Sequence, residues 1–229
     1  MRLDRFLSNA TALSRSQAQR AVRAGRVIVD GVVVKLASTN IELSAQVFLD
    51  EVQVAAPQPR YLMLHKPVGV VCAAEDPTHR TAIDLLDLPN PAGLHFAGRL
   101  DIDATGLVLI TDDGHWSHRI VSPVSHCAKT YRVWLADPLD EQEAGRLAKG
   151  ITLQGEKQPT RPADIERLSS REFCLTISEG RYHQVKRMFA ALGNRVIRLH
   201  RESIGALSLD PDLAAGEYRS LSADEVAFF

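Results

Sequence analysis

The sequence lacks the features that mark disulfide-rich, metal-binding or membrane proteins. Its 229 residues include only three cysteines, which lie far apart without a C-x-x-C pair, and this excludes a disulfide framework and a zinc knuckle. No apolar run has the length of a membrane span, and the first residues lack the apolar core of a signal peptide. We therefore expect a cytoplasmic protein that works in a reducing compartment without membrane contact.

The sequence also lacks cofactor signatures and an overall excess of basic residues. It contains neither a G-x-x-x-x-G-K-[ST] phosphate loop nor a dinucleotide fingerprint. His115 and His118 are close in sequence but have no third ligand nearby. The 27 basic and 28 acidic residues give a net charge of −1, so nucleic-acid binding would depend on local charge. We expect no cofactor and no metal.

The first quarter of the chain begins with two predicted helices, at residues 4–9 and 14–25. Ser14 and Gln17 have the spacing of a capping box, and Gly25 stands where a glycine ends a helix. The apolar residues of the second helix fall on one side and its basic residues on another. One face of this helix is therefore expected to pack and the other to be basic.

Positive charge is concentrated in this part of the chain. Residues 1–40 contain seven basic and two acidic side chains, a surplus of five. A solvated basic face is the ordinary interpretation of such a run, but a basic stripe also fits an RNA phosphate backbone. We expect RNA contacts from Arg15, Arg23 and Arg26.

Two valine runs at residues 27–34 flank Asp30 and Gly31, which predicts a hairpin with a two-residue turn. Two helices, a basic stripe and this hairpin resemble the S4-type RNA-binding module, which is common in RNA-modifying enzymes and ribosomal proteins. We expect this module to end with residue 56.

A stretch without periodicity follows, and it contains two prolines, which predicts a linker at residues 57–60. A second domain is expected at residues 61–229. Helices and strands alternate there without a fixed repeat, which indicates an α+β fold. The expected strands lie at residues 61–65, 70–72, 108–110 and 129–135, and a helix is expected at 139–149.

The most informative segment is residues 98–107, which read GRLDIDATGL. An apolar run with the composition of a buried strand follows, and Thr105 and Gly106 are expected to turn the chain just before it. Asp101 is thereby placed near the mouth of a strand. An aspartate carboxylate can act as a nucleophile without a separate activating base.

Asp101 needs a cation to hold it in place. Arg99 lies on the opposite side of an extended chain and could equally form a plain loop ion pair. Residues 180–189, GRYHQVKRMF, offer a second source because they have an apolar stripe at helical spacing. Lys186 borders this stripe and can reach an internal cleft, whereas Arg187 points away and suits phosphate.

Residues 98–107 resemble the G-R-L-D-x-x-T-x-G-L signature of the RNA pseudouridine synthases that modify ribosomal RNA. Other segments resemble further motifs of this family: KPVG at residues 66–69, KTY at 129–131 and GRYHQVKRM at 180–188. The first of these is thought to support the catalytic loop rather than to react.

The resemblance implies a role for each matching residue. Asp101 is the catalytic residue, and Lys186 takes the place of the basic residue that pairs with it, where the family often has arginine. Tyr131 matches a tyrosine that stacks on the target base, and Leu199 an apolar residue of the uracil pocket. On sequence alone, Tyr131 and Leu199 could equally be core residues. Arg99 is assigned to substrate binding.

A second basic cluster is predicted at residues 181–201, which contain six basic residues and no acidic one. Its members are Arg181, Lys186, Arg187, Arg195, Arg198 and Arg201. We expect Arg181 and Arg187 to bind RNA, with an affinity that falls steeply as salt rises.

The resemblance covers nearly the whole chain and is nearest to the family members that act on small-subunit ribosomal RNA. It implies an α+β fold: a small N-terminal S4-like αα-β module, and a catalytic domain with a central mixed, mostly antiparallel sheet flanked by helices. The implied activity is cofactor-free conversion of one uridine to pseudouridine, with base flipping. The substrate is expected in a partly assembled small-subunit particle, bound by a monomer.

Two alternatives stay open at this point. The target could be large-subunit RNA, because relatives with the same motifs act there, or the chain could be a non-catalytic RNA-binding assembly factor. Glycoside hydrolysis by Asp101 and Asp103 is a weaker third reading, since alternation along an extended chain would point the two carboxylates apart.

Overall fold

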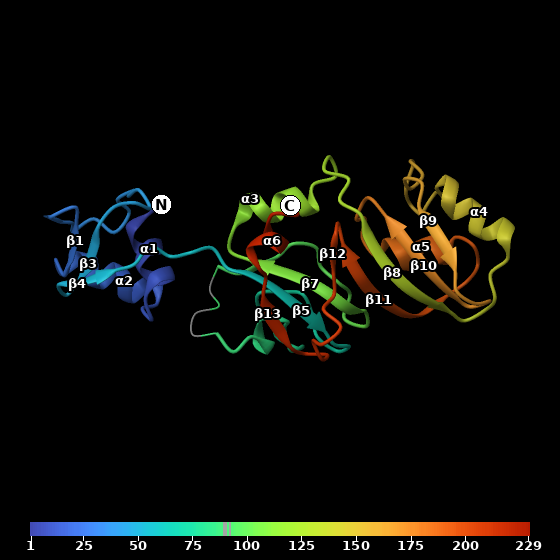
Figure 1. The fold of residues 1–229 in the computed structure, drawn as a ribbon, viewed down its shortest axis with the longest axis horizontal. Helices are drawn as coiled ribbons and strands as arrows, with labels where there is room; N and C mark the ends of the chain where they lie inside the picture. Colours follow the sequence, from blue (N-terminus) through green and yellow to red (C-terminus); the bar gives the residue numbers. More distant parts are fainter. Residues whose placement is uncertain (89–90, 92) are drawn as a thin grey trace. The chain divides into compact units, whose positions relative to one another are not determined.

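The computed structural model describes residues 1–88, 91 and 93–229 (Figure 1). The chain divides into two compact units, one built mainly from Met1–Pro59 and the other from Arg60–Asp87 together with Gly93–Phe229. No helix among the described residues is long and apolar enough to cross a membrane.

The first unit combines two helices with a four-stranded antiparallel sheet in the order β2-β1-β3-β4. Its elements are α1 (Leu3–Ala10), α2 (Arg15–Arg23), β1 (Val27–Val29), β2 (Val32–Val33), β3 (Val47–Leu49) and β4 (Val52–Val54). The apolar faces of α1 and α2 are buried with the strands in one core that includes Phe6, Val22, Val27 and Val47.

The local signals predicted for this unit are confirmed. Ser14 and Gln17 exchange two hydrogen bonds at the start of α2, and these form the capping box. Asp30 and Gly31 adopt φ angles of +49° and +81°, which a two-residue hairpin turn requires, and they connect β1 to β2.

The second unit is built on a nine-stranded sheet. Its strands are β5 (Tyr61–Lys66), β6 (His95–Phe96), β7 (Thr105–Thr111), β8 (Lys129–Leu135), β9 (Asp164–Arg167), β10 (Glu172–Ile177), β11 (Val196–Ile204), β12 (Leu207–Ser208) and β13 (Tyr218–Ser220). Its helices are a 3₁₀ turn (Ile83–Leu85), α3 (Gly114–Val121), α4 (Glu141–Lys149), α5 (Gln184–Ala190) and α6 (Ala223–Val226).

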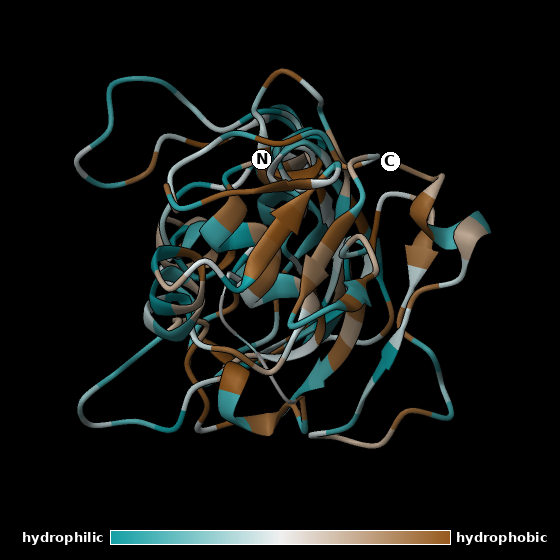
Figure 2. Ribbon diagram, turned by 90° about the vertical axis from the view of Figure 1, so that its left-hand side faces the viewer, coloured by the Kyte–Doolittle hydropathy of each residue, from teal (hydrophilic) through white to brown (hydrophobic). Residues whose placement is uncertain are grey.

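The main path of this sheet runs β13-β5-β7-β11-β8-β10-β9, with β12 and β6 paired to β11 and β7. Only the pairing of β7 with β11 is parallel among the described strands, so the predicted mixed, mostly antiparallel sheet is confirmed. Hydrophobic colour gathers on the strands in Figure 2, and many connecting loops are hydrophilic.

Strand β7 lies in the interior, where six of its seven residues are buried. Leu107 and Leu109 pack with Trp116 and Ile120 of α3, which covers this part of the sheet. The Asp113 side chain accepts hydrogen bonds from two backbone N–H groups at the start of α3 and is its N-cap. A rigid, buried strand therefore follows the Asp101 loop directly.

The prediction that Thr105 and Gly106 form a turn before the strand is wrong. Both belong to β7, where they pair with β11. A Cβ on Gly106 would lie 2.2 Å from the backbone oxygen of Arg201, so glycine is present because two strands approach closely. Local sequence cannot distinguish this use of glycine from a turn.

Two other boundaries differ from expectation. Residues 70–72 do not continue a strand, because only Val71 forms an isolated bridge, to Thr81. The helix expected at residues 139–149 begins at Glu141, since Asp140 caps its N-terminus through the backbone N–H of Glu143. The strands expected at residues 61–65 and 129–135 are confirmed.

Candidate active site

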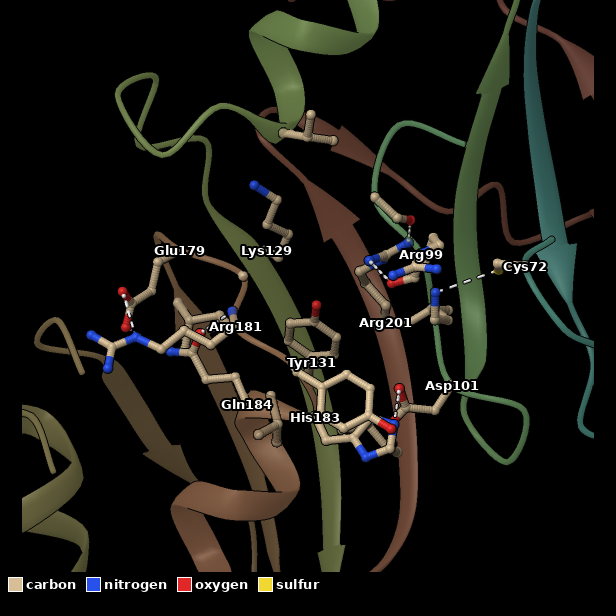
Figure 3. Close-up of a pocket in the computed structure, with 18 of the residues that line it drawn as sticks. Cys72, Arg99, Asp101, Lys129, Tyr131, Glu179, Arg181, His183, Gln184 and Arg201 are labelled. Atoms are coloured by element: carbon tan, nitrogen blue, oxygen red, sulfur yellow. Dashed lines mark hydrogen bonds and ion pairs between the residues drawn. The ribbon is translucent and has the colours of Figure 1, made fainter. Parts of the chain in front are cut away.

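A cleft of about 490 Å³ opens in the second unit. Its volume is in the range typical of small-molecule sites. The predicted catalytic and substrate-site residues all line it: Arg99, Asp101, Tyr131, Lys186 and Leu199. Residues far apart in the sequence therefore meet at one cavity, part of which is drawn in Figure 3.

Hydrogen bonds from Lys66 hold the backbone of the loop that carries Asp101. The Lys66 side chain is fully buried, and its Nζ donates hydrogen bonds of 2.8 Å to the backbone oxygens of Pro67 and Ala104. Burial lowers the pKa of Lys66. The N–H of Gly69 donates to the carbonyl of Ile102 at 2.8 Å. The KPVG segment therefore fixes the backbone on both sides of the turn after Asp101.

Lys186 of α5 provides the cation that Asp101 requires. Its Nζ lies 2.9 Å from Oδ2 of Asp101, and Val185, Met188 and Phe189 on the same helix are buried. The helical spacing predicted this arrangement: the apolar stripe packs inward and Lys186 reaches the cleft from its border. An ammonium group gives a single point contact here, where an arginine could make two.

The expectation that Asp101 and Asp103 point apart is wrong. Lys186 also donates to Oδ1 of Asp103 at 2.5 Å, so one ammonium holds both carboxylates. The chain is not extended between them, because the N–H of Ala104 bonds to the carbonyl of Asp101 and closes a turn. Partial burial opposes the charged form of Lys186, but the hydrogen bonds to Asp103 and Asp101 raise its pKa.

Tyr131 and Leu199 lie on adjacent strands, β8 and β11, and both are nearly buried in the cleft wall. The guanidinium of Arg201 lies 5.9 Å from the centre of the Tyr131 ring. Figure 3 shows Tyr131 between Arg201 and the segment that carries His183 and Gln184. An aromatic ring and an aliphatic side chain thus form an apolar wall near the Asp101 carboxylate.

Arg201 was expected on a basic surface and is instead 1% exposed. It donates at 2.7 Å to the backbone oxygens of Leu107 and Gly98, and at 3.4 Å to that of Arg99. The buried guanidinium thus holds the backbone of the loop just before Asp101 through these hydrogen bonds. The side chain of Arg99 lies at the cleft, where Figure 3 shows it next to Arg201.

Arg181 and Arg187 contact acidic residues that lie outside residues 181–201. Glu156 accepts from Arg181, and its other oxygen lies 2.7 Å from Nη1 of Arg187. Arg181 also lies 3.2 Å from Glu179 and donates to the carbonyls of Gln158 and Pro159. Counting charge along residues 181–201 missed both carboxylates, because Glu179 lies just before this range and the fold supplies Glu156 from a distant segment.

The three arginines predicted to contact RNA in the first unit differ in their surroundings. Arg15 lies 3.4 Å from the buried carboxylate of Asp4. Arg26 forms a two-point ion pair with Asp50. Arg23 is exposed, and its side chain has no hydrogen bond or ion pair to any residue in the described part of the chain. Its charge is therefore the most available of the three to a ligand.

His183 is a site residue that sequence reasoning did not single out. Its Nε2 lies 3.3 Å from Oδ1 of Asp101, and Figure 3 shows the two side chains facing each other. The residue precedes α5 with φ +47° and ψ +37°, a left-handed conformation that is uncommon for residues other than glycine. No local pattern marks this position, since both the backbone conformation and the contact depend on the fold.

The chain matches two family models. The family model described as RNA pseudouridylate synthase matches residues 60–191, and that of the S4 domain matches residues 1–47. The chain belongs to the RNA pseudouridylate synthase family. Members of this family are isomerases, so the prediction of an isomerase is confirmed.

Similar proteins cover almost the full length of the chain. It is 53% identical over 227 residues to the ribosomal small subunit pseudouridine synthase A of Vibrio cholerae, covering 99% of this chain and 98% of the relative. The protein of the same name from Escherichia coli K12 is 52% identical, with 99% of each chain covered. A crystal structure of a pseudouridylate synthase superposes with a TM-score of 0.72 and 49% identity, covering 99% of this chain and 98% of that one.

Proposed function

We propose that this protein converts one uridine of small-subunit ribosomal RNA to pseudouridine, with Asp101 as the catalytic residue. The observation that carries the proposal is the Asp101 carboxylate, held by Lys186 on the wall of a cleft with a nearly buried tyrosine beside it. The similarity to proteins named for the small subunit, over 99% of the chain, supports the choice of RNA.

The reaction needs no external reagent because uridine and pseudouridine are isomers. The bond from the ribose to N1 of uracil breaks, the base turns, and a bond to C5 forms while C5 loses a proton and N1 gains one. The target uridine must leave the RNA helix to reach a partly buried carboxylate in a cleft. Asp101 then acts on the flipped nucleotide, with Tyr131 against the base.

The apolar side of the cleft has a separate role. A detached uracil must turn without escaping, so water and open exits have to be excluded from the cavity. Leu199 and Tyr131, which expose 5% and 8% of their surfaces, provide such a wall. Arg99 at the same cleft is placed to contact the anionic RNA around the flipped nucleotide.

We assign residues 1–56 to RNA binding, 57–60 to a linker and 61–229 to catalysis. Arg15, Arg23 and Arg26 would contact phosphates from the first domain, and Arg181 and Arg187 from the second. The protein would act as a monomer in the cytoplasm on a partly assembled small-subunit particle, without a cofactor or a metal. Long-range electrostatic attraction to RNA then adds to the specific contacts in the cleft.

The deciding experiment compares wild type with Asp101→Asn on unmodified small-subunit RNA, with and without early-binding ribosomal proteins. Pseudouridine is mapped by carbodiimide adducts and reverse transcription. One new stop that depends on Asp101 supports the proposal and identifies the uridine. A stop found only in large-subunit RNA would keep the chemistry and replace the substrate, whereas tight binding with no stop in either RNA would favour an assembly factor.

A further inference from the structure

Tyr182 is a large aromatic side chain that remains exposed at the catalytic cleft. It exposes 74% of its surface although it lines the same cavity as Asp101. Its ring stacks on that of His183, with ring centres 3.8 Å apart and an angle of 21° between the planes. One face of the tyrosine is thus covered by the imidazole, while the rest of the ring is left to solvent.

The other ring of the stack reaches the catalytic carboxylate. The two oxygens of Asp101 have different neighbours: Nε2 of His183 lies 3.3 Å from Oδ1, and Nζ of Lys186 lies 2.9 Å from Oδ2. His183 is held in the left-handed backbone region, where glycine or asparagine is accommodated more easily. The imidazole therefore links the exposed tyrosine to the Asp101 carboxylate.

The backbone under the stack is held by arginines. Arg187 donates to the carbonyl of Tyr182 at 3.0 Å and to that of Gln154 at 3.0 Å, and its charge faces Glu156. Arg181, on the other side of Tyr182, is bound by Glu156 and Glu179. Both guanidinium groups have acidic partners, and the open face of Tyr182 is an uncharged surface that this segment offers to a ligand in addition to them.

We propose that the Tyr182–His183 stack is a subsite for the base of an unpaired nucleotide beside the target uridine, and that His183 is a positioning residue for Asp101. The inference rests on the proposed function and adds a second contact between the protein and the RNA, next to the target uridine. Flipping one nucleotide leaves a neighbouring base without its stacking partner, and aromatic side chains bind such bases irrespective of sequence. A base seated on Tyr182 would extend the stack that holds the imidazole, whose Nε2 faces the Asp101 carboxylate.

The subsite is tested with Tyr182→Ser and Tyr182→Trp, in the full chain and on the RNA that wild type modifies. We expect Tyr182→Ser to raise KM about tenfold, the loss of one base–aromatic stack, and Tyr182→Trp to retain wild-type KM. Ile197→Ser is the matched control, because Ile197 is 61% exposed and does not line the cleft. Equal KM values for all variants and wild type would overturn the subsite.

A modified RNA separates stacking from a general loss of affinity. Once the target is mapped, RNAs with an abasic nucleotide on either side of it are compared with the intact RNA. We expect one of them to weaken binding to wild type by about tenfold and to leave binding to Tyr182→Ser unchanged, because the same contact is already absent. Equal losses for both proteins with either RNA would overturn the assignment of a base to Tyr182.

The positioning role is tested with His183→Gln and His183→Asn. Glutamine can place an N–H donor where Nε2 lies, whereas asparagine is too short but suits the left-handed backbone better. We expect His183→Asn to lower the single-turnover rate at saturating RNA about tenfold or more, with KM less affected, and His183→Gln to recover most of it. The reverse order, or equal rates, would overturn the positioning role.

Failure of this inference can be told apart from failure of the proposed function. If wild type forms pseudouridine and the Tyr182 and His183 variants match it, only the inference fails. If wild type forms none in any RNA, the proposed function fails, and the subsite is judged by the affinity of wild type and Tyr182→Ser for the same RNA. Unequal affinities then support the subsite, and equal affinities overturn it.

Discussion

The ammonium of Lys186 lies 2.9 Å from Oδ2 of Asp101 and 2.5 Å from Oδ1 of Asp103. This contact joins the loop before β7 to the first turn of α5. Both carboxylates contact the same ammonium group, but they differ in exposure. Asp103 exposes 63% of its side chain and Asp101 only 23%. The more enclosed carboxylate is the one that faces the cleft wall.

Lys186→Met should reduce activity strongly without unfolding the protein. The variant leaves Asp101 without its cation, and displacement of a catalytic group by about 1 Å can lower a rate by about 100-fold. Lys186→Arg keeps the charge and should retain most of the activity, with altered geometry. The single-turnover rate of pseudouridine formation measures this, with Lys149→Met, an exposed lysine of α4, as control. A Lys186→Met enzyme as fast as wild type would contradict the role.

Asp103→Asn should have a small effect where Asp101→Asn abolishes the reaction. The Lys186 hydrogen bond lowers the pKa of Asp103, so the carboxylate is charged at neutral pH, but it is largely exposed. Loss of an exposed ion pair changes a rate by less than about fivefold. Rates of the two variants on one RNA test this, and an inactive Asp103→Asn would assign chemistry to both carboxylates.

Gly106→Ala should destabilise the second unit by about 3 kcal/mol or more, because the new methyl group meets the Arg201 backbone at a φ of +109°. Gly145→Ala in α4 is the matched control. Nothing lies within 4 Å of a Cβ there, so it should stabilise by about 0.5–1 kcal/mol. Both tryptophans, Trp116 and Trp134, lie in the second unit, so their fluorescence in urea reports its unfolding.

Acid should weaken the second unit through His200. Burial, with help from nearby His65, Arg198 and Arg132, lowers the pKa of His200 to about 4, against 6.5 for a free histidine. Its neutral ring exchanges a hydrogen bond with Thr105. The stabilisation is therefore complete above pH 6.5 and is lost as pH falls toward 4, because the unfolded chain binds the proton more tightly.

The expected loss between pH 7 and pH 4.5 is about 2 kcal/mol, because pH 4.5 lies about two units below the pKa of the unfolded chain and still above that of the folded protein. His200→Gln removes the titrating group and should show a flatter dependence over the same interval. Urea unfolding followed by tryptophan fluorescence at both pH values measures the difference. An equal pH dependence in wild type and variant would exclude His200 as its source.

Arg23→Ala should weaken RNA binding and reduce its salt dependence. Each phosphate contact contributes about 0.7–0.9 to the slope of log affinity against log salt concentration, so the slope should fall by about that amount. Arg23→Lys keeps the charge and should restore both. Titrations of the same RNA at several salt concentrations provide the measurement, and an unchanged slope for Arg23→Ala would remove Arg23 from the RNA contact.

Much of the fold followed from local sequence. The capping box at Ser14 and the turn at Asp30 and Gly31 were predictable because each depends on hydrogen bonds within a few residues. The placement of Lys186 at the cleft also followed, since a helix fixes which residues border its apolar stripe. These features require no knowledge of distant segments.

The remaining features were decided by contacts between distant parts of the chain. Gly106 lets β11 approach β7 closely and does not form a turn. Arg201 is buried and does not add charge to the surface. Glu156 neutralises a cluster that appears purely basic along the chain. His183 becomes a neighbour of Asp101 only when α5 packs beside the loop. The sequence by itself determined many of the helices and strands, because those depend on local periodicity, and it contained the motifs that resemble the family. The tertiary structure decided which charges meet, because ion pairs depend on distance in space.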